Sequence, residues 1–251
     1  EVIVGSLSSL KDVTNFVENV DIFTFENEFL NADLYREILA LFPKKVVFPD
    51  INVLEAVQNK LNQKFIFQKL NLKTAPFLVY DEKLDDLQGW LQSLFTHFPM
   101  GCMIKWAQGG YDGKGNFSLK QATLVPNALE FCQKALVKNI RIYAEELIPF
   151  QREVAMVYCR SLKQQFITYP LVISEQQDNV CKLVYGPATE FGISQNLEAL
   201  AIEYGQKIAN QFSYIGTFAL EFFVTKAGDL IINEMAPRVH NTGHYTLDAC
   251  Q

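Results

Sequence analysis

The spacing of apolar positions along the first fifty residues switches between that of strands and that of helices. Three short β-branched runs alternate with two helical patterns: the runs span 2–5, 21–25 and 44–48, and the helical patterns span 9–20 and 31–42. Strands that alternate with helices are typical of a parallel sheet with helices on its faces. The pattern predicts that residues 1–50 form part of an α/β domain with a doubly wound parallel sheet.

The next seventy residues mix longer helical patterns with short strands. A single helix is predicted over 52–70, because apolar residues recur there at spacings of three and four. These residues are Leu54, Val57, Leu61 and Phe65. A second helix is predicted over 81–98, where an acidic first turn suits the helix dipole. The predicted strands span 74–80, 101–107 and 116–120.

From about residue 140 the strands become longer and resemble an antiparallel meander. They span 141–148, 152–160 and 165–173. One long helix is predicted over 194–215, with Ser194 as its N-cap. Its apolar stripe consists of Leu200, Tyr204, Ile208 and Phe212. A final hairpin is predicted over 216–237.

This hairpin places two acids opposite each other. If the chain turns about Ala227 and Gly228, the register sets Glu221 against Glu234, with Cβ atoms roughly 4.5 to 5.5 Å apart. Two carboxylates so placed repel each other, so they share a proton or hold a cation. Oxygen ligands with no neighbouring His or Cys on that face favour Mg²⁺. The competing interpretation is a solvated hairpin face whose register is shifted by one, which the flanking apolar residues disfavour.

A glycine-rich loop from Gly109 to Gly115 joins two predicted strands. Rossmann and Walker loops open a helix, so this loop belongs to neither class. It can lie over a polyphosphate, with backbone N–H groups approaching the ligand and Lys114 supplying charge. A plain hairpin turn is the alternative. Lys105 lies in an otherwise apolar strand, where its ammonium needs an anionic partner or access to solvent.

Acidic residues also gather where the strand at 141–148 ends. Glu145 and Glu146 precede an apolar turn, and Glu153 follows it. Such a segment can offer backbone groups to a purine edge and a carboxylate to ribose hydroxyls. A surface strand end is equally compatible with the pattern.

Composition and net charge limit the classes of binding partner that this chain can have. A formal net charge of -6 leaves no general basic field, which disfavours nucleic-acid binding, so an anionic partner must meet a local cluster. The turn at 238–244 gathers Arg238, His240 and His244, although the two histidines taken alone are compatible with ordinary loop residues. Five cysteines without a C-x-x-C pair disfavour a zinc site or a disulfide framework. No apolar run reaches the ~18 to 20 residues of a membrane span, and we expect a cytoplasmic protein.

Taken in order, these motifs resemble the ATP-grasp superfamily, and within it the 5-(carboxyamino)imidazole ribonucleotide synthase branch. The resemblance rests on the strand lysine, "GGYDGKG", "EELI", "REV", "ALEFFV" and "NEMAPRVHNTGH", and it extends upstream to "DIFTFENE". After the partial α/β domain at 1–50, it implies an α+β ATP-grasp domain at 51–251. Two subdomains with antiparallel sheets are implied, a smaller one at about 70–143 and a larger one at about 144–251. The family's N-terminal glycine-rich loop and C-terminal domain are absent from this sequence, so we expect both ends to be cut from a longer protein.

The resemblance implies a ligase with ATP and Mg²⁺ as cofactors. It implies that bicarbonate is activated as carboxyphosphate and that the amine of 5-aminoimidazole ribonucleotide is carboxylated, in de novo purine biosynthesis. ADP and phosphate are the other products, a homodimer is the family habit, and the loop at 111–115 is the expected lid. Two alternatives stay open: another ATP-grasp carboxylate-amine ligase, or a nucleotide-binding module without catalysis.

Carried over position by position, the resemblance assigns a role to each motif. The residues expected to contact ATP are Lys60, Lys105, Tyr111, Asp112, Gly113, Lys114, Gly115, Asn116, Glu145, Glu146, Leu147, Ile148, Glu153, Gln176 and Asn233. Glu221 and Glu234 are expected to bind Mg²⁺. The substrate falls to Arg238, His240, Asn241, Thr242, Gly243 and His244, and the catalytic residues are Arg238, His240 and Lys114. The chain departs from the family at Lys60, where Arg is usual, and at Gln176, where His is usual.

Overall fold

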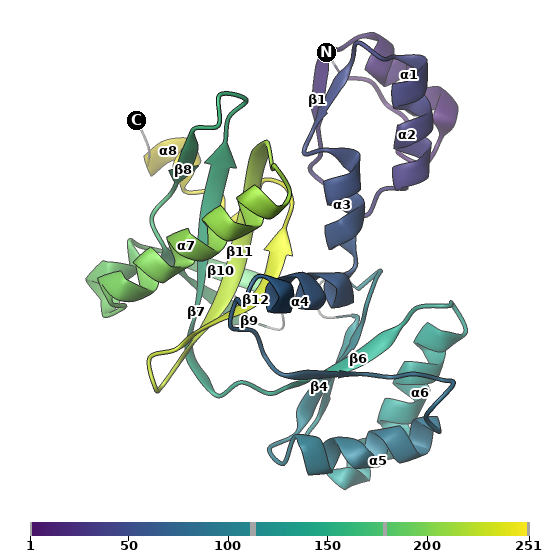
Figure 1. Cartoon of the computed structure of the whole chain (residues 1–251), viewed down its shortest axis with the longest axis vertical. Coiled ribbons are helices and arrows are strands. Elements are labelled where there is room, and N and C mark those ends of the chain that lie inside the picture. Colours follow the sequence, from purple (N-terminus) through teal and green to yellow (C-terminus); the bar gives the residue numbers. More distant parts are fainter. Residues whose placement is uncertain (1, 111–113, 178–179, 250–251) are drawn as a thin grey trace.

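The computed structural model describes residues 2–110, 114–177 and 180–249, which form three lobes around a central helix (Figure 1). The first lobe (residues 2–58) holds a two-stranded parallel sheet in which Ile22 lies opposite Val46. Its elements are α1 (Leu10–Glu18), β1 (Ile22–Thr24), α2 (Ala32–Leu41), β2 (Val46–Phe48) and α3 (Ile51–Gln58). The parallel pairing matches the prediction, whereas membership of a larger doubly wound sheet stays a prediction.

The strand predicted at 2–5 is wrong. Residues 2–6 form neither helix nor strand, and the side chains of Val2 and Val4 are 88% and 94% exposed. A β-branched run becomes a strand only when a partner strand and a buried face compensate the ordering of its backbone. Neither is present at this position.

The helix predicted over 52–70 is two helices, α3 and α4 (Lys60–Lys69). Asn59 interrupts them in an extended conformation, and its side chain accepts a hydrogen bond from the N–H of Asn62. The break rotates α4, so that Leu61 is buried but Phe65 is 44% exposed. The apolar spacing alone could not show this change of direction, because a cap in mid-pattern preserves the spacing on either side.

In the described part of the small-sheet lobe (residues 71–146), the strands lie in the order β3-β6-β4-β5, and all neighbours are antiparallel. Its elements are β3 (Phe77–Val79), α5 (Leu87–His97), β4 (Cys102–Trp106), β5 (Asn116–Leu119), a short 3₁₀ turn (Ala122–Leu124), α6 (Val125–Leu136) and β6 (Ile142–Glu146). Helices α5 and α6 bury Leu94 and Ala128 in the core beneath the sheet. Helix α5 begins six residues later than predicted; Asp86 caps it, and the other acids precede it.

The large-sheet lobe (residues 150–249) contains strands in the order β10-β9-β7-β11-β12, with β8 paired to β7. Its elements are β7 (Phe150–Arg160), β8 (Phe166–Thr168), β9 (Val172–Gln177), β10 (Val180–Tyr185), a 3₁₀ turn (Ala188–Phe191), α7 (Gln195–Gln211), β11 (Gly216–Thr225), β12 (Leu230–Ala236), a 3₁₀ turn (Asn241–Gly243) and α8 (Thr246–Ala249). Ser194 caps α7 as predicted. Ile208 of α7 and Phe218 of β11 share the core between them.

Helix α7 approaches β7 closely because it carries a glycine at the contact. A Cβ added to Gly205 would lie 2.1 Å from the ring of Tyr158, whose hydroxyl donates to the carbonyl of Ala201 at 2.8 Å. We expect Gly205→Ala to lower the free energy of unfolding by about 1 to 3 kcal/mol, because overpacking outweighs the gain in helix propensity. Chemical denaturation measures this, with the exposed Gln206→Ala on the same helix as the control. An unchanged stability would show that the helix can shift outward at no cost.

Helix α4 lies where the three lobes meet (Figure 1). Leu61 packs against Ala107 and Tyr143 of the small-sheet lobe, and Phe67 enters the core of the large-sheet lobe. A helix that is buried on two sides fixes the lobes relative to each other. Side chains along α4 therefore hold set positions towards both sheets. Among the described residues, no helix is both long and apolar enough to cross a membrane.

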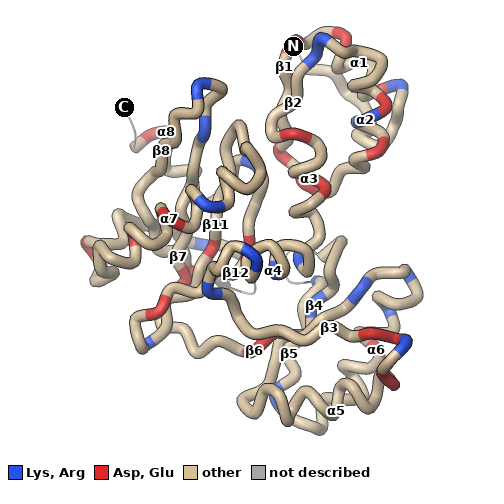
Figure 2. The backbone as a smooth tube through the Cα atoms, in the orientation of Figure 1, with Lys and Arg blue, Asp and Glu red and all other residues tan. Residues whose placement is uncertain are grey.

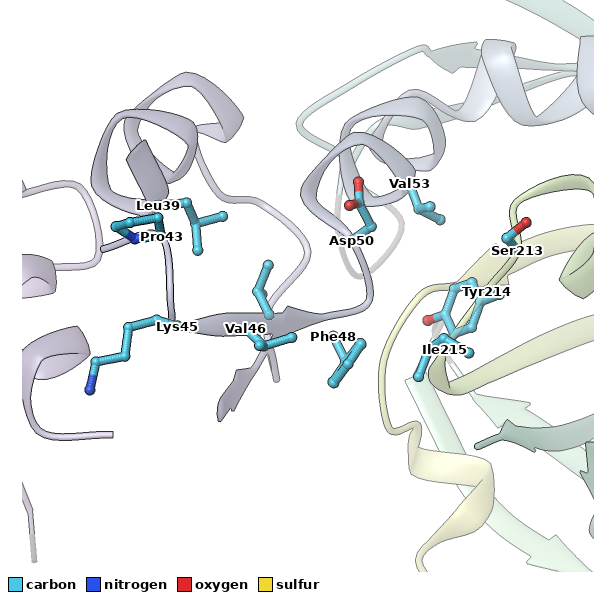
Figure 3. A pocket seen from close by; sticks show the side chains of 11 residues that line it. Leu39, Pro43, Lys45, Val46, Phe48, Asp50, Val53, Ser213, Tyr214 and Ile215 are labelled. Carbon is cyan, nitrogen blue, oxygen red and sulfur yellow. The ribbon is translucent and has the colours of Figure 1, made fainter. Parts of the chain in front are cut away.

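A cavity of about 440 Å³ separates the first lobe from the large-sheet lobe (Figure 3). It is lined by Leu39, Pro43, Lys45, Val46, Val47, Phe48, Asp50, Val53, Ser213, Tyr214 and Ile215. This lining is mostly apolar and contains none of the acids and lysines singled out in the sequence. The acids and lysines that form the ion pairs Lys60–Glu234, Lys64–Glu145 and Lys105–Glu145 lie elsewhere, around α4.

Candidate active site

The two acids of the last hairpin do lie opposite each other. Glu221 of β11 pairs with Glu234 of β12, as predicted, but the predicted turn register is wrong by one residue. Next to the turn, Val224 faces Leu230, and a β-bulge at Asn233 then restores the register at the acids. Without this extra residue, Glu221 would face Asn233, so the bulge creates the carboxylate pair.

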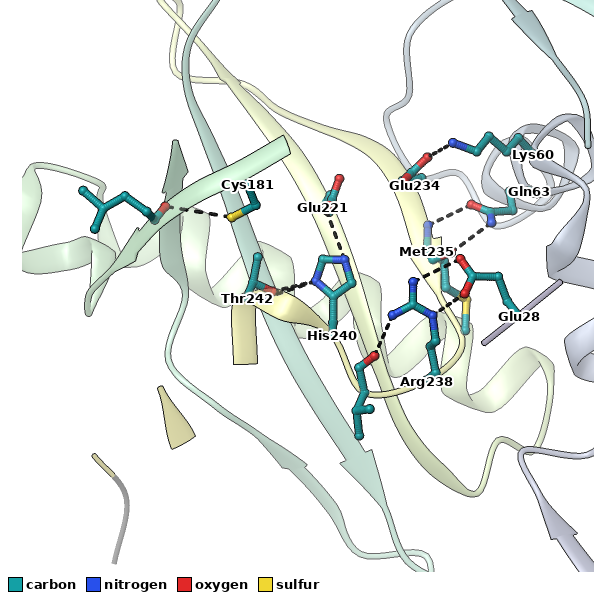
Figure 4. Close-up of polar contacts among 12 residues, drawn as sticks. Glu28, Lys60, Gln63, Cys181, Glu221, Glu234, Met235, Arg238, His240 and Thr242 are labelled. Atoms are coloured by element: carbon teal, nitrogen blue, oxygen red, sulfur yellow. Dashed lines mark hydrogen bonds and ion pairs between the residues drawn. The ribbon is translucent and has the colours of Figure 1, made fainter. Parts of the chain in front are cut away.

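Glu234 of this pair contacts a lysine, and Glu221 contacts a histidine (Figure 4). The Nζ of Lys60, on α4, donates to Oε2 of Glu234 at 2.6 Å. The Nε2 of His240 lies 3.3 Å from Oε1 of Glu221. The turn after β12 thus brings a histidine to the acids, which spacing within the hairpin could not show.

A second charged cluster lies beside the first, in the small sheet. Lys105 of β4 forms an ion pair with Glu145 of β6, and the Nζ of Lys64 lies 2.8 Å from the other oxygen of Glu145. All three residues are at most 7% exposed. The Nζ of Lys105 also lies 3.5 Å from Oδ1 of Asn233, which links the two clusters. Figure 2 shows the basic segments of α4 close to acidic segments of both sheets.

Burial and charge separate the pKa values of the two opposed acids. Burial raises the pKa of Glu221 to about 8, and the charge of Glu234 adds to the effect. Burial also acts on Glu234, but the ammonium groups of Lys60 and Lys105 outweigh it and lower its pKa to about 2. At neutral pH without a metal, the pair therefore shares one proton, held by Glu221.

The turn after β12 fixes two further groups. Nδ1 of His240 accepts from the N–H of Thr242 and lies 2.8 Å from its hydroxyl, which assigns the remaining ring proton to Nε2, towards Glu221. Burial and the charge of Arg238 lower the pKa of His240, so the ring is neutral at pH 7. Arg238 itself forms a bidentate ion pair with Glu28, which arrives from the first lobe.

The glycine-rich loop lies between β4 and β5. Gly110 and Gly115 face each other so closely that a Cβ on either would lie 2.7 to 2.8 Å from the other's Cα, so both stems of the loop require glycine. Lys114 is exposed, and Asn116 begins β5 opposite Lys105. The predicted residues Tyr111, Asp112 and Gly113 lie outside the described residues.

The acidic segment after β6 continues towards the large sheet. The N–H of Glu146 donates to the carbonyl of Pro76 at 2.9 Å. The N–H of Leu147 donates to the carbonyl of Gly101 at the longer distance of 3.5 Å. Glu153 lies two residues from Ala155, the β7 partner of Glu221, and burial raises its pKa. Gln176 is exposed on β9, opposite Cys181.

These donors fit one kind of cation. Two carboxylates facing each other suit a hard divalent ion such as Mg²⁺. Among the described residues, no group of three or more His, Cys, Asp or Glu could hold a metal alone. A cation between Glu221 and Glu234 would therefore complete its shell with water and with oxygens of a bound anion, beside Lys60 and Lys105.

This pair should make cation binding depend on pH. Because Mg²⁺ needs both carboxylates charged, binding below pH 8 must displace the proton of Glu221. We expect the affinity for Mg²⁺ to rise by up to about tenfold per pH unit and to level off near pH 8. Calorimetric titration of the metal from pH 6 to 9 measures this, and Glu221→Gln should bind weakly without the slope. A flat profile in the wild type would contradict the shared proton.

The stability of the metal-free protein should follow the same proton. The pKa of Glu221 in the folded protein lies above its ordinary value. The contribution of Glu221 to the free energy of unfolding is therefore full below about pH 4.5 and is lost as the pH rises through about 8.

Comparison with known proteins decides the family. A family model described as "ATP-grasp domain" matches residues 65–251. The chain belongs to the ATP-grasp family. The fold agrees, because both antiparallel sheets of this ATP-grasp domain recur in solved structures of the family.

Named relatives and structures are more specific. The chain is 33% identical over 247 residues to a phosphoribosylaminoimidazole carboxylase of Candida albicans, covering 98% of this chain and 41% of the relative. It is 31% identical to an N5-carboxyaminoimidazole ribonucleotide synthase of Saccharolobus solfataricus, covering 96% and 60%. A crystal structure of N5-carboxyaminoimidazole synthase from Aspergillus clavatus, in complex with ADP and 5-aminoimidazole ribonucleotide, is similar at 27% identity and a TM-score of 0.84, covering 98% and 60%. The chain thus spans less than two thirds of each of these proteins.

The structure adds site residues that sequence reasoning missed. Gln63 and Lys64 of α4 reach the ATP-grasp site, although the family match begins only at residue 65. With Lys60 they follow the i, i+3, i+4 spacing of one helix face, which could have indicated them. Glu28 carried no such signal, because it meets Arg238 across 210 positions of sequence.

Proposed function

We propose that this chain is the ATP-binding part of a ligase that carboxylates 5-aminoimidazole ribonucleotide with bicarbonate. ATP would supply the energy, and the products would be 5-(carboxyamino)imidazole ribonucleotide, ADP and phosphate, formed through carboxyphosphate in de novo purine biosynthesis. The single observation that carries this proposal is the pair Glu221 and Glu234 beside Lys60, followed directly by the turn with Arg238 and His240. The names of the relatives point the same way.

The residues around α4 fit ATP and Mg²⁺. The carboxylate of Glu145 is buried between Lys64 and Lys105, so residues 145–148 would line the adenine with the backbone groups of the segment that ends β6. Lys60, Lys105 and Lys114 would face the phosphates, together with Asn116 and Asn233. Glu153 would hold the ribose, and Gln176 would complete the nucleotide site.

Glu221 and Glu234 would hold the metal, which when bound neutralises phosphate charge as it develops. Lys105 would do the same as a fixed positive charge. Lys60 would release Glu234 when ATP binds and turn to phosphate oxygens. The loop at 111–115 would cover the site and keep water from carboxyphosphate.

The turn at 238–244 would bind the ribonucleotide. Arg238 would exchange Glu28 for the phosphate, or share its guanidinium between them. Nε2–H of His240 would donate to substrate oxygens, since Nδ1 is already engaged by Thr242. Backbone groups of Asn241 and Gly243, with the side chain of His244, would complete this subsite.

The wider organisation belongs to the same proposal. Residues 1–50 would complete a doubly wound domain with chain outside this sequence, and residues 51–251 would be the ATP-grasp domain, divided near residue 143. The protein would act as a homodimer in the cytoplasm on small molecules.

The direct test measures ADP release by the full-length protein. With bicarbonate and 5-aminoimidazole ribonucleotide both present, ADP should appear at a steady rate, and omission of either should reduce that rate strongly. The carboxylated product should match ADP mole for mole. Indifference to both omissions would reject this ligase, and a response to another amine would indicate a different ATP-grasp ligase.

A further inference from the structure

Lys64 is a buried cation that the proposed reaction does not use. It is 1% exposed, and its Nζ lies 2.8 Å from Glu145. The same ammonium donates to the hydroxyl of Thr74 at 2.7 Å, and that hydroxyl donates to the carbonyl of Ile232 on β12 at 2.9 Å. Lys64 is therefore tied to both sheets and has no freedom to turn to a ligand.

Glu145 is the shared counter-ion of two ammonium groups. Lys64 holds one carboxylate oxygen and Lys105 the other, so that the three side chains together carry one positive charge. Of the two lysines, Lys105 is the one that points towards the opposed acids, because its Nζ also lies 3.5 Å from Oδ1 of Asn233, next to Glu234. The excess charge of the cluster is thus directed at the place proposed for the nucleotide phosphates.

We propose that Lys64 is a positioning residue. It neutralises Glu145 at the carboxylate oxygen that Lys105 does not contact, and this leaves Lys105 free to bind phosphate. This inference rests on the proposed nucleotide function. If the ammonium of Lys64 were absent, Glu145 and Lys105 would form a closed one-to-one pair of zero net charge. In a site this buried, such a pair is costly to open, and Lys105 would be held towards β6. Phosphate affinity would fall although no phosphate contact had been removed.

The test compares ligands with and without phosphates, using the full-length protein. Binding of Mg-ATP and of adenosine is measured by calorimetry for the wild type and for Lys64→Met. We expect the affinity for ATP to fall by about tenfold or more, while that for adenosine changes less than about threefold, as for loss of a charge-assisted interaction. Lys64→Arg keeps the charge and should retain most of the ratio between the two affinities. A purely structural lysine would lower both affinities alike.

The double variant Lys64→Met/Glu145→Gln makes the test sharper. Removing the carboxylate as well should release Lys105 and return the ATP-to-adenosine ratio towards the wild-type value, which is a coupling that a double-mutant cycle measures. Absence of this rescue would overturn the inference. Should Lys64→Met fail to fold, Glu145→Gln alone decides: its ratio should equal or exceed that of the wild type, and a fall would reject the role of Lys64.

The outcomes separate the two proposals. A wild type that binds Mg-ATP, together with an unchanged ratio in Lys64→Met, would reject the role of Lys64 and leave the nucleotide function standing. A full-length wild type that binds no ATP would overturn both.

Discussion

Glu234→Gln is expected to abolish Mg²⁺-dependent ATP turnover, with a loss of at least about a thousandfold, while the protein stays folded. Glu234 is the acid that stays charged at neutral pH, because Lys60 and Lys105 lower its pKa despite burial. Glutamine has the same shape but takes away the charge that a hard cation requires. The variant keeps only Glu221, so a single carboxylate remains to hold the metal.

Steady-state ADP release by the full-length protein measures this loss, and Mg²⁺ titration shows whether metal affinity falls with it. The protein should stay folded, since the pair of Lys60 and Glu234 is partly exposed and the variant loses one ion pair only. Glu203→Gln is the matched control, because Glu203 also pairs with a lysine but lies on the surface of α7. Turnover close to that of the wild type would remove Glu234 from the metal site.

Arg238→Met is expected to lower kcat/KM for 5-aminoimidazole ribonucleotide by about a hundredfold to ten-thousandfold, with little change in the binding of Mg-ATP. The guanidinium is the group on this turn that can hold a phosphate in two parallel hydrogen bonds, and it already holds the carboxylate of Glu28 in that way. Lysine keeps the charge but loses the fork, so Arg238→Lys should fall between the wild type and Arg238→Met.

Initial rates with the ribonucleotide varied, together with calorimetry of Mg-ATP, separate the two effects. Arg36→Met serves as the control, because Arg36 also contacts carboxylates, Asp33 and Glu55, but lies in the first lobe away from the site. Glu28→Gln gives a further comparison: it should loosen Arg238 without removing it and should change KM more than kcat. Equal losses of ATP and ribonucleotide binding in Arg238→Met would assign Arg238 to the fold rather than to the substrate.

The helix break at Asn59 separates what local sequence predicts, the two helices, from what tertiary packing decides, the direction of the second helix. Apolar spacing predicted helix on both sides of Asn59, and both helices exist. The direction of α4 depends on its burial between two sheets, which no local pattern encodes. That direction carries Lys60, Gln63 and Lys64 into the site. Their spacing could indicate one helix face, but only the packing of α4 shows that this face meets both sheets.

The amino-acid sequence by itself determined most elements and the chemistry: a parallel pair of strands, an antiparallel meander, two acids on the last hairpin, and a guanidinium in the turn after it. These follow from short-range periodicity and side-chain type, which act over a few residues. Only the tertiary structure decided which charges meet. The bulge at Asn233 set Glu221 against Glu234, Glu145 came between two lysines, and Glu28 reached Arg238 from another lobe. Such pairs form because burial penalises any charge left alone, and the partner that satisfies it is chosen by packing rather than by nearness in the chain.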